Sequence, residues 1–175
     1  TGELTRIEGD AVGSYAINQG SVSAGLNYAV SYVPANLTVT AKPLAITAVA
    51  NSKIYGETDP KLAYTTIGLS SGDSLTGSLT RTGDNNVGTY SIEVGSLSAG
   101  SNYTISFTAA NFEITKKKLT ITADAKSKVY GDSDPALTYQ SSGLVGTDSM
   151  TGELTRIEGD AVGSYAINQG SVSAG

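Results

Sequence analysis

The side chains in this chain that could most readily bind a metal ion or catalyse a reaction are carboxylates in its last third. Asp132, Asp134 and Asp148 lie within a short stretch and offer oxygen atoms, the ligands that Ca²⁺ prefers. Ca²⁺ takes six to eight oxygens, however, and the spacing here matches neither an EF-hand loop nor the glycine-rich calcium-binding nonapeptides. We therefore expect no cofactor and retain Ca²⁺ as the alternative.

Pairs of carboxylates can also act as acid and base in glycoside hydrolysis. Asp132 with Asp134, and Glu8 with Asp10, are such pairs, but they fall in predicted turns of small modules that leave no room for a substrate cleft. The chain also contains no His and no Cys, so it lacks the commonest catalytic base and any thiolate nucleophile. We expect no catalytic residues, no metal site and no enzymatic activity.

Two lysines occupy equivalent positions and could take part in covalent chemistry of another kind. Lys53 and Lys128 could each form an amide bond with an asparagine side chain, a linkage that replaces disulfides in some surface stalks. The sequence alone identifies no buried acid and asparagine that would complete such a site. The only basic run, residues 116–118, stands alone in a chain of net charge −5, which argues against nucleic acid as a partner.

The sharpest local motif is Tyr-Gly-x-x-Asp-Pro, which occurs twice. Glycine can adopt positive φ, aspartate can bond its own backbone to close a turn, and proline directs the chain into extended conformation. The tyrosine can bury its ring while its hydroxyl stays in water. We therefore predict a structural corner, and we leave any binding residues unassigned. The motif residues are Tyr55, Gly56, Asp59, Pro60, Tyr130, Gly131, Asp134 and Pro135.

An internal repeat of 75 residues organises the chain. Residues 43–100 and 118–175 align without a gap and are identical at 31 of 58 positions. Residues 1–25 recur unchanged as residues 151–175, at twice that spacing. Such self-similarity is the signature of tandem modules.

The repeat predicts one complete module flanked by two partial ones. Residues 43–117 form the complete module, residues 1–42 the C-terminal part of another, and residues 118–175 the N-terminal part of a third. Because severed modules leave open sheet edges, we expect this sequence to be a window on a longer chain.

Each module is predicted to be almost entirely β. Apolar and polar residues alternate at period two, which is typical of half-buried strands, and turn-forming clusters separate them every 8–12 residues. The expected strands cover residues 28–32, 37–39, 44–48, 88–92, 103–107, 112–114, 119–123 and 163–167.

The joint between modules contains no glycine. Residues 112–122 run from the last strand of one module to the first of the next, and Pro43 occupies the earlier joint. A glycine- and serine-rich linker would be flexible, whereas a strand that continues into a strand is expected to be stiff. We therefore expect small modules joined end to end.

The combined motifs resemble a known family. Leu-Thr-Ile-Thr-Ala, then Lys-x-Tyr-Gly-x-x-Asp-Pro-x-Leu-x-Tyr, Gly-Asp-Ser-Leu-Thr-Gly, Val-Gly-x-Tyr and Asn-Tyr-x-Ile-x-Phe follow one another in the order seen in MBG domains of the YGX type. The resemblance implies a β-grasp-like fold, with an immunoglobulin-like β-sandwich as the alternative. It also implies tandem repeats of large bacterial surface and filamentous-haemagglutinin-like adhesins, and it brings no catalytic residues.

Two classes of function follow as expectations. In the first, the repeats are a stiff spacer in an extracellular adhesin stalk or surface filament at the cell surface, with neighbouring repeats or copies of the chain as partners. In the second, each repeat binds carbohydrate or a host surface. A related alternative is polymerisation by β-strand complementation, in which residues 26–42 of one molecule supply strands missing after Gly175 of another.

Overall fold

The computed structural model describes all residues 1–175 and contains strands, turns and loops but no helix. The mainly β expectation is therefore confirmed, while the choice between a β-grasp-like and an immunoglobulin-like arrangement stays a prediction. No helix is present that is long and apolar enough to cross a membrane.

The chain divides into two compact units, each assembled from several stretches of sequence. The first contains Thr1–Asn51, Lys61–Gly83 and Tyr90–Phe112. The second contains Ser52–Pro60, Asp84–Thr89 and Glu113–Gly175. The predicted division at residues 42 and 117 follows the repeat in the sequence and stays a prediction.

The first unit begins with an antiparallel sheet of three strands in the order β1-β2-β3. The strands are β1 (Thr5–Arg6), β2 (Gly13–Asn18) and β3 (Ala35–Val39). Tyr15 stands opposite Leu37 in the register. No residue of these three strands is fully buried.

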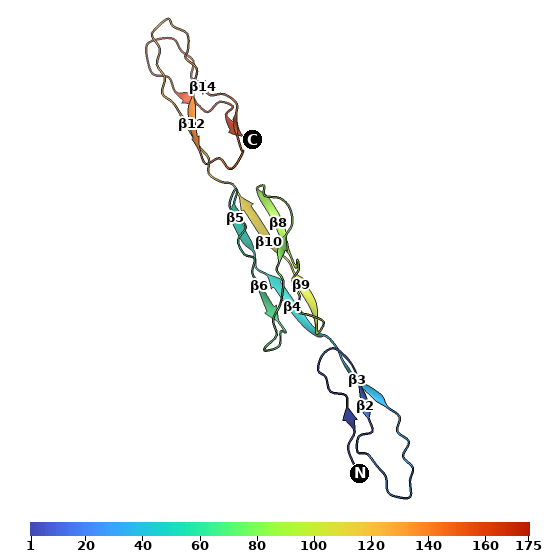
Figure 1. The fold of residues 1–175 in the computed structure, drawn as a ribbon. Coiled ribbons are helices and arrows are strands. Elements are labelled where there is room, and N and C mark those ends of the chain that lie inside the picture. Colours follow the sequence, from blue (N-terminus) through green and yellow to red (C-terminus); the bar gives the residue numbers. More distant parts are fainter. The chain divides into compact units, whose positions relative to one another are not determined.

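A second sheet in this unit has the order β6-β4-β9 (Figure 1). Strand β4 (Lys42–Ala48) pairs antiparallel with β6 (Tyr64–Ile67) and parallel with β9 (Tyr103–Thr108). Its alternating residues Leu44, Ile46 and Ala48 are buried while their neighbours face solvent. This period of two is what the sequence predicts for a half-buried strand.

A four-stranded sheet has the order β5-β10-β8-β7. Its strands are β5 (Asn51–Ile54), β10 (Ala110–Thr115), β8 (Gly88–Glu93) and β7 (Thr80–Arg81). Ile92, Phe112 and Ile114 are buried along these strands, together with Lys53, the one buried charged residue.

The second unit ends in three short antiparallel ladders. They join β11 (Thr120–Ala123) to β12 (Tyr139–Ser142), β13 (Met150–Thr151) to β16 (Ser173–Ala174), and β14 (Thr155–Arg156) to β15 (Ile167–Asn168). Val172 is the only apolar residue from residue 118 onward that is buried.

Two of the expected strands are wrong or shortened, for one shared reason. Residues 28–32 form no strand, and only Ile167–Asn168 is a strand where residues 163–167 were expected. Their counterparts 75 positions away are β9, which pairs with β4, and β8, which lies between β10 and β7. The positions that would supply a second β4 or β10 precede Thr1 or follow Gly175, so these stretches lack the partner that makes an extended segment a strand.

Candidate functional site

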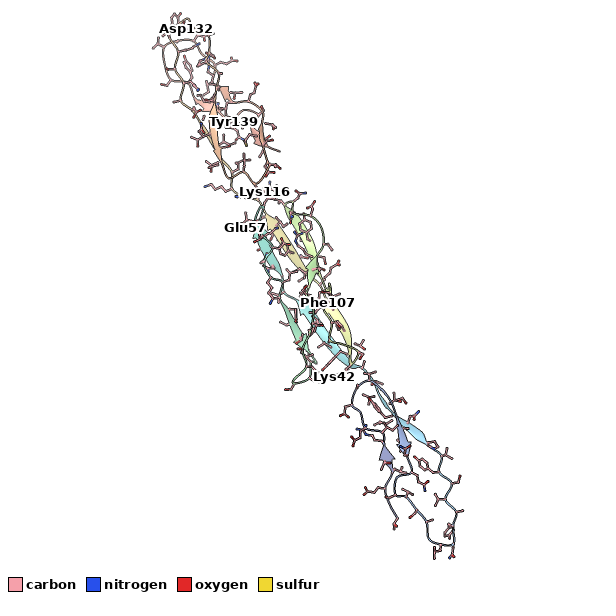
Figure 2. The ribbon with its side chains drawn as sticks, in the orientation of Figure 1. Lys42, Glu57, Phe107, Lys116, Asp132 and Tyr139 are labelled. Carbon is pink, nitrogen blue, oxygen red and sulfur yellow. The ribbon has the colours of Figure 1, made fainter.

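The Tyr-Gly-x-x-Asp-Pro corner begins where β5 ends. The backbone N–H of Glu57 donates to the carbonyl of Ile54 at 3.1 Å, and the N–H of Ile54 donates to Glu57 Oε2 at 2.9 Å. The N–H of Tyr55 donates to the carbonyl of Thr115 at 2.9 Å. The corner is thereby fixed beside the end of β10, and Figure 2 shows Glu57 and Lys116 at the same end of these strands.

A buried lysine, Lys53, binds two residues of the corner through its ammonium group. The side chain of Lys53 is only 5% exposed, and its Nζ lies 2.6 Å from Asp59 Oδ1. The same Nζ donates to the carbonyl of Glu57 at 3.0 Å and to Asn85 Oδ1 at 3.2 Å. A charge in so enclosed a place needs partners for each of its N–H groups, and the structure supplies three acceptors.

The second copy of the corner repeats most of this arrangement. Lys128 Nζ lies 2.7 Å from Asp134 Oδ1 and donates to the carbonyl of Asp132 at 3.1 Å. Its side chain is 26% exposed, because residues 126–129 have no neighbouring strand in the place that β10 takes beside β5. The lysine therefore fastens the corner in both copies, with different degrees of burial.

Asp134 also binds an arginine. Arg156 Nε donates to Asp134 Oδ2 at 2.5 Å, and the guanidinium of Arg156 together with the ammonium of Lys128 lowers the pKa of Asp134 to about 2. Asp59 and Asp134 thus each pair with a cation, and their predicted role in closing the turn stays a prediction.

The three aspartates considered for Ca²⁺ do not converge. Asp134 is engaged by two cations, and Asp132 lies at the end of its segment remote from Lys116 (Figure 2). Asp148 instead accepts a hydrogen bond from Tyr55. No group of three or more metal-ligating side chains occurs in the structure.

The outer face of the first corner contacts a turn that follows β12. Tyr55 Oη donates to Asp148 Oδ1 at 3.3 Å, and this hydrogen bond and the carboxylate charge raise the pKa of Tyr55. A Cβ on Gly56 would lie 2.6 Å from Cγ2 of Val145, so a larger residue would collide with that side chain. We call this contact between Tyr55, Gly56, Val145 and Asp148 the corner joint.

The second corner has no such neighbour. Tyr130 is 73% exposed, and a Cβ on Gly131 would meet nothing within 4 Å. Gly56 and Gly131 have nearly the same backbone, with φ of 86° and 91°. The two corners therefore differ in what they touch, not in how they fold.

The aspartate of the joint has an equivalent with a second tyrosine partner. Asp73, 75 positions before Asp148, accepts a hydrogen bond at Oδ2 from the hydroxyl of Tyr103, which itself accepts one from the N–H of Ser70 at 3.0 Å. Tyr55 uses the other oxygen, Oδ1, of Asp148. Asp73 thus accepts from a tyrosine of its own MBG segment, and Asp148 from a tyrosine of the preceding one.

A second contact of this kind lies near β2. The N–H of Val12 donates to Asn102 Oδ1 at 2.9 Å. Val87, the counterpart of Val12, lines a small cavity of about 350 Å³ together with Tyr55, Asp148 and Gly175. Gly175 lies two positions before the counterpart of Asn102, which would be residue 177. The loops that contain Val12 and Val87 therefore each lie close to the same turn of a neighbouring MBG segment.

A larger cavity of about 710 Å³ opens within residues 123–167. It is lined by residues of the second corner and of the stretch around Tyr165, including Leu137 and Ile167. In residues 1–42 the equivalent stretch is covered by β3, which pairs with β2 through Tyr15 and Leu37. The cavity therefore occupies the place that a strand equivalent to β3 or β10 would fill.

Comparison with protein families decides what this arrangement belongs to. The family model of the MBG domain (YGX type) matches residues 1–38, 44–113 and 119–175. The chain belongs to this MBG family. The resemblance drawn from the motifs is confirmed over all three segments. Searches of curated proteins and of solved structures gave no match.

The MBG family is a family of structural domains. MBG repeats are a structural domain type and are typical of bacterial surface proteins. The corner joint links Tyr55, in the MBG segment 44–113, to Val145 and Asp148, in the MBG segment 119–175. The tyrosine and glycine that characterise the motif are thus the residues that touch the next MBG segment.

Several residues of this site carry no distinctive sequence signal. Val145 corresponds to Ser70 in the other copy, and Asn85 corresponds to an aspartate, so the repeat does not mark either of them. Lys53 and Lys128 do carry a signal, because a lysine stands two positions before the motif tyrosine in both copies. That shared offset could have identified them as part of the corner.

Proposed function

We propose that this chain is a structural repeat of an extracellular bacterial adhesin stalk or surface filament, in which it acts as a stiff spacer. The observation that carries the proposal is the corner joint. A spacer resists bending when each repeat touches the next at more than the covalent connection, and Tyr55 and Gly56 provide such a contact with Val145 and Asp148.

The covalent connection supports the same function. Strand β10 ends at Thr115 and β11 begins at Thr120, and the residues between them are three lysines and a leucine, without glycine. A short connection of this composition has less conformational freedom than a glycine- and serine-rich linker. The joint and the connection together restrict the motion of one MBG segment relative to the next.

The test is a measurement of orientation in solution. Residual dipolar couplings of residues 44–113 and 119–175 should fit a single alignment tensor in the wild-type chain. Tyr55→Ala combined with Asp148→Ala should split it into two weaker, independent tensors. Tyr130→Ala is the matched control and should leave the shared tensor unchanged, because the Tyr130 side chain is exposed and takes no part in the corner joint. Independent tensors in the wild type would contradict the proposal.

A second candidate function is polymerisation by strand complementation, which the recurrence of residues 1–25 as residues 151–175 favours. Residues 26–42 of one molecule contain β3, and the surface that β3 covers in residues 1–25 recurs, letter for letter, in residues 151–175. Sedimentation velocity over a wide range of concentration tests this candidate. Chains that associate end to end as concentration rises would support it, and a constant monomer would exclude it.

Binding of surface carbohydrate by each repeat is the remaining alternative, and it needs accessible aromatic rings. Tyr64 is 36% exposed, whereas Tyr103 is half-buried with its hydroxyl engaged by Ser70 and Asp73. A glycan array probed with the 175-residue chain separates the two functions. Specific retention would favour binding, and a spacer is expected to give none.

A further inference from the structure

We propose that Lys53 and Asn85 form an intramolecular amide bond, with Asp59 as the residue that moves the protons. The three side chains meet at one atom, Lys53 Nζ, which lies 2.6 Å from Asp59 Oδ1 and 3.2 Å from Asn85 Oδ1. This places an amine, a carboxamide and a carboxylate together around a side chain that is 5% exposed.

Each partner is delivered by a different element. Lys53 is in β5, Asp59 is in the corner, and Asn85 is in the loop between β7 and β8. The backbone of Lys53 is held from its other side, because Thr115 Oγ1 donates to its carbonyl at 3.3 Å. Reaction needs the nitrogen and the attacked carbon about 3–3.5 Å apart. Cγ of Asn85 is bonded directly to the oxygen that Nζ already touches, so a small rotation of the Asn85 side chain achieves this distance.

The reaction exchanges one amine for another and needs no oxidant or reductant. Asp59 takes a proton from the ammonium of Lys53, and the free electron pair of Nζ forms a bond to Cγ of Asn85 while the C=O electrons move to Oδ1. Asp59 then gives its proton to Nδ2 and takes a second one from Nζ. The Cγ–Nδ2 bond breaks as the carbonyl reforms, and ammonia leaves with the remaining proton as ammonium.

The position of the Lys53 amine favours this outcome over hydrolysis. Water attacking Cγ would convert Asn85 to aspartate, but the amine occupies the position next to the carbonyl and is held there by Asp59 and by the carbonyl of Glu57. Holding the two reactants in place replaces an encounter in solution, which is a large part of the barrier to amide exchange.

The other copy of the corner lacks two of these conditions. At the position of Asn85 it has Asp160, whose Oδ1 lies 3.8 Å from Lys128 Nζ and whose side chain is 87% exposed. The lysine itself is more exposed, at 26%. An ionised carboxylate is a poor acceptor of an amine, so we assign the bond to Lys53 and Asn85 and not to Lys128 and Asp160.

The bond would close a covalent loop between β5 and the loop that precedes β8. Residues 54–84 would then lie inside this loop and could not be drawn out when the chain is pulled from its two ends. The inference is independent of the spacer function, because the bond could form in a repeat of any function.

Mass spectrometry of the intact, denatured 175-residue chain tests the proposal. The expected mass is lower than that of the sequence by one ammonia molecule, and trypsin should yield a branched peptide that joins Lys53 to Asn85 and is uncut after Lys53. A chain at full mass that is cut after Lys53 would overturn the proposal. So would an ammonia loss found only in linear peptides, since that reports cyclisation of an asparagine.

Variants separate the chemistry from the fold. Asn85→Ala removes the acceptor at an exposed loop position and should abolish the ammonia loss and the branched peptide. Asp59→Asn keeps both reacting groups and should also abolish them, with circular dichroism showing that the strands persist. Lys128→Ala is the matched control and should leave the bond at Lys53 intact. A branched peptide that persists in Asp59→Asn would overturn the assigned role of Asp59.

Discussion

The hydroxyl of Tyr55 donates a hydrogen bond to Oδ1 of Asp148 at 3.3 Å, across 93 positions of sequence. Tyr130, the counterpart of Tyr55, has its ring exposed to solvent and no such partner. The same Tyr-Gly-x-x-Asp-Pro corner thus occurs once in contact with Asp148 and once without such a contact. This pair of corners gives each experiment on the joint an internal control in the same molecule.

Gly56→Ala is expected to disrupt the joint, whereas Gly131→Ala is not. Both substitutions place a Cβ at positive φ, which costs about 1–2 kcal/mol in each case. Only the Cβ at position 56 would also meet Val145, at 2.6 Å. Amide resonances around Val145 and Asp148 should therefore shift in Gly56→Ala and stay in place in Gly131→Ala. Equal shifts in the two variants would show that Val145 does not pack on Gly56.

The joint should weaken at alkaline pH. Asp148 raises the pKa of Tyr55 above its usual value, so the neutral phenol is favoured in the folded state. The stability that this bond contributes is complete below pH ~10 and is lost as the pH rises through the raised pKa of Tyr55. Ultraviolet titration should show that Tyr55 ionises at a higher pH than its usual pKa would give. Asp148→Asn should restore an ordinary titration, and an unchanged curve in that variant would contradict the prediction.

The second corner should be sensitive to acid. Its Asp134 has a pKa of about 2 in the folded chain, lowered from 3.8 by Arg156 and Lys128. A lowered pKa stabilises the folded state above pH ~4, and this contribution disappears as the pH falls towards 2. Asp134→Asn should reduce the melting temperature at pH 7 and flatten its dependence on pH between 4 and 2. A pH profile identical to that of the wild type would show that the ion pairs contribute nothing to stability.

The core of the middle segment should depend on Phe112. Its ring is fully buried in β10, and Arg81 lies over it at 5.2 Å from the ring centre. Phe112→Ala is expected to lower the free energy of unfolding by about 3–5 kcal/mol, measured by urea denaturation. Leu37, at the equivalent position of β3, is 41% exposed, so Leu37→Ala should cost much less. Equal losses would mean that residues 1–42 pack a core of their own.

The sequence predicted the strands whose pairing partners lie in the chain. Strands β4, β9 and β10 follow directly from local alternation of apolar and polar residues. Residues 28–32 carry the same alternation but form no strand, because alternation shows only that a segment can pair. Whether it does pair depends on a second segment far away in the sequence.

The candidate site divides in the same way. The corner itself was predictable, since glycine, aspartate and proline at fixed offsets specify a local turn. Its contacts were not, because Asn85 and Asp148 are 32 and 93 positions away in the sequence from Lys53 and Tyr55, the residues that they contact. The pairing of Asp59 with Lys53 was missed because a turn-forming role for aspartate is the commoner one.

The carboxylate shared by the joint has a consequence for how such a protein can change over time. Asp73 accepts a hydrogen bond from Tyr103 of its own repeat, while Asp148 accepts one from Tyr55 of the preceding repeat, so the aspartate is present in both repeats with a different partner in each. Recombination between gene copies could therefore insert or delete repeats and keep the tyrosine and the aspartate of the joint, whereas Val145 would be exchanged for a residue such as its counterpart Ser70. The length of the protein could then differ between members of a population through the number of repeats alone.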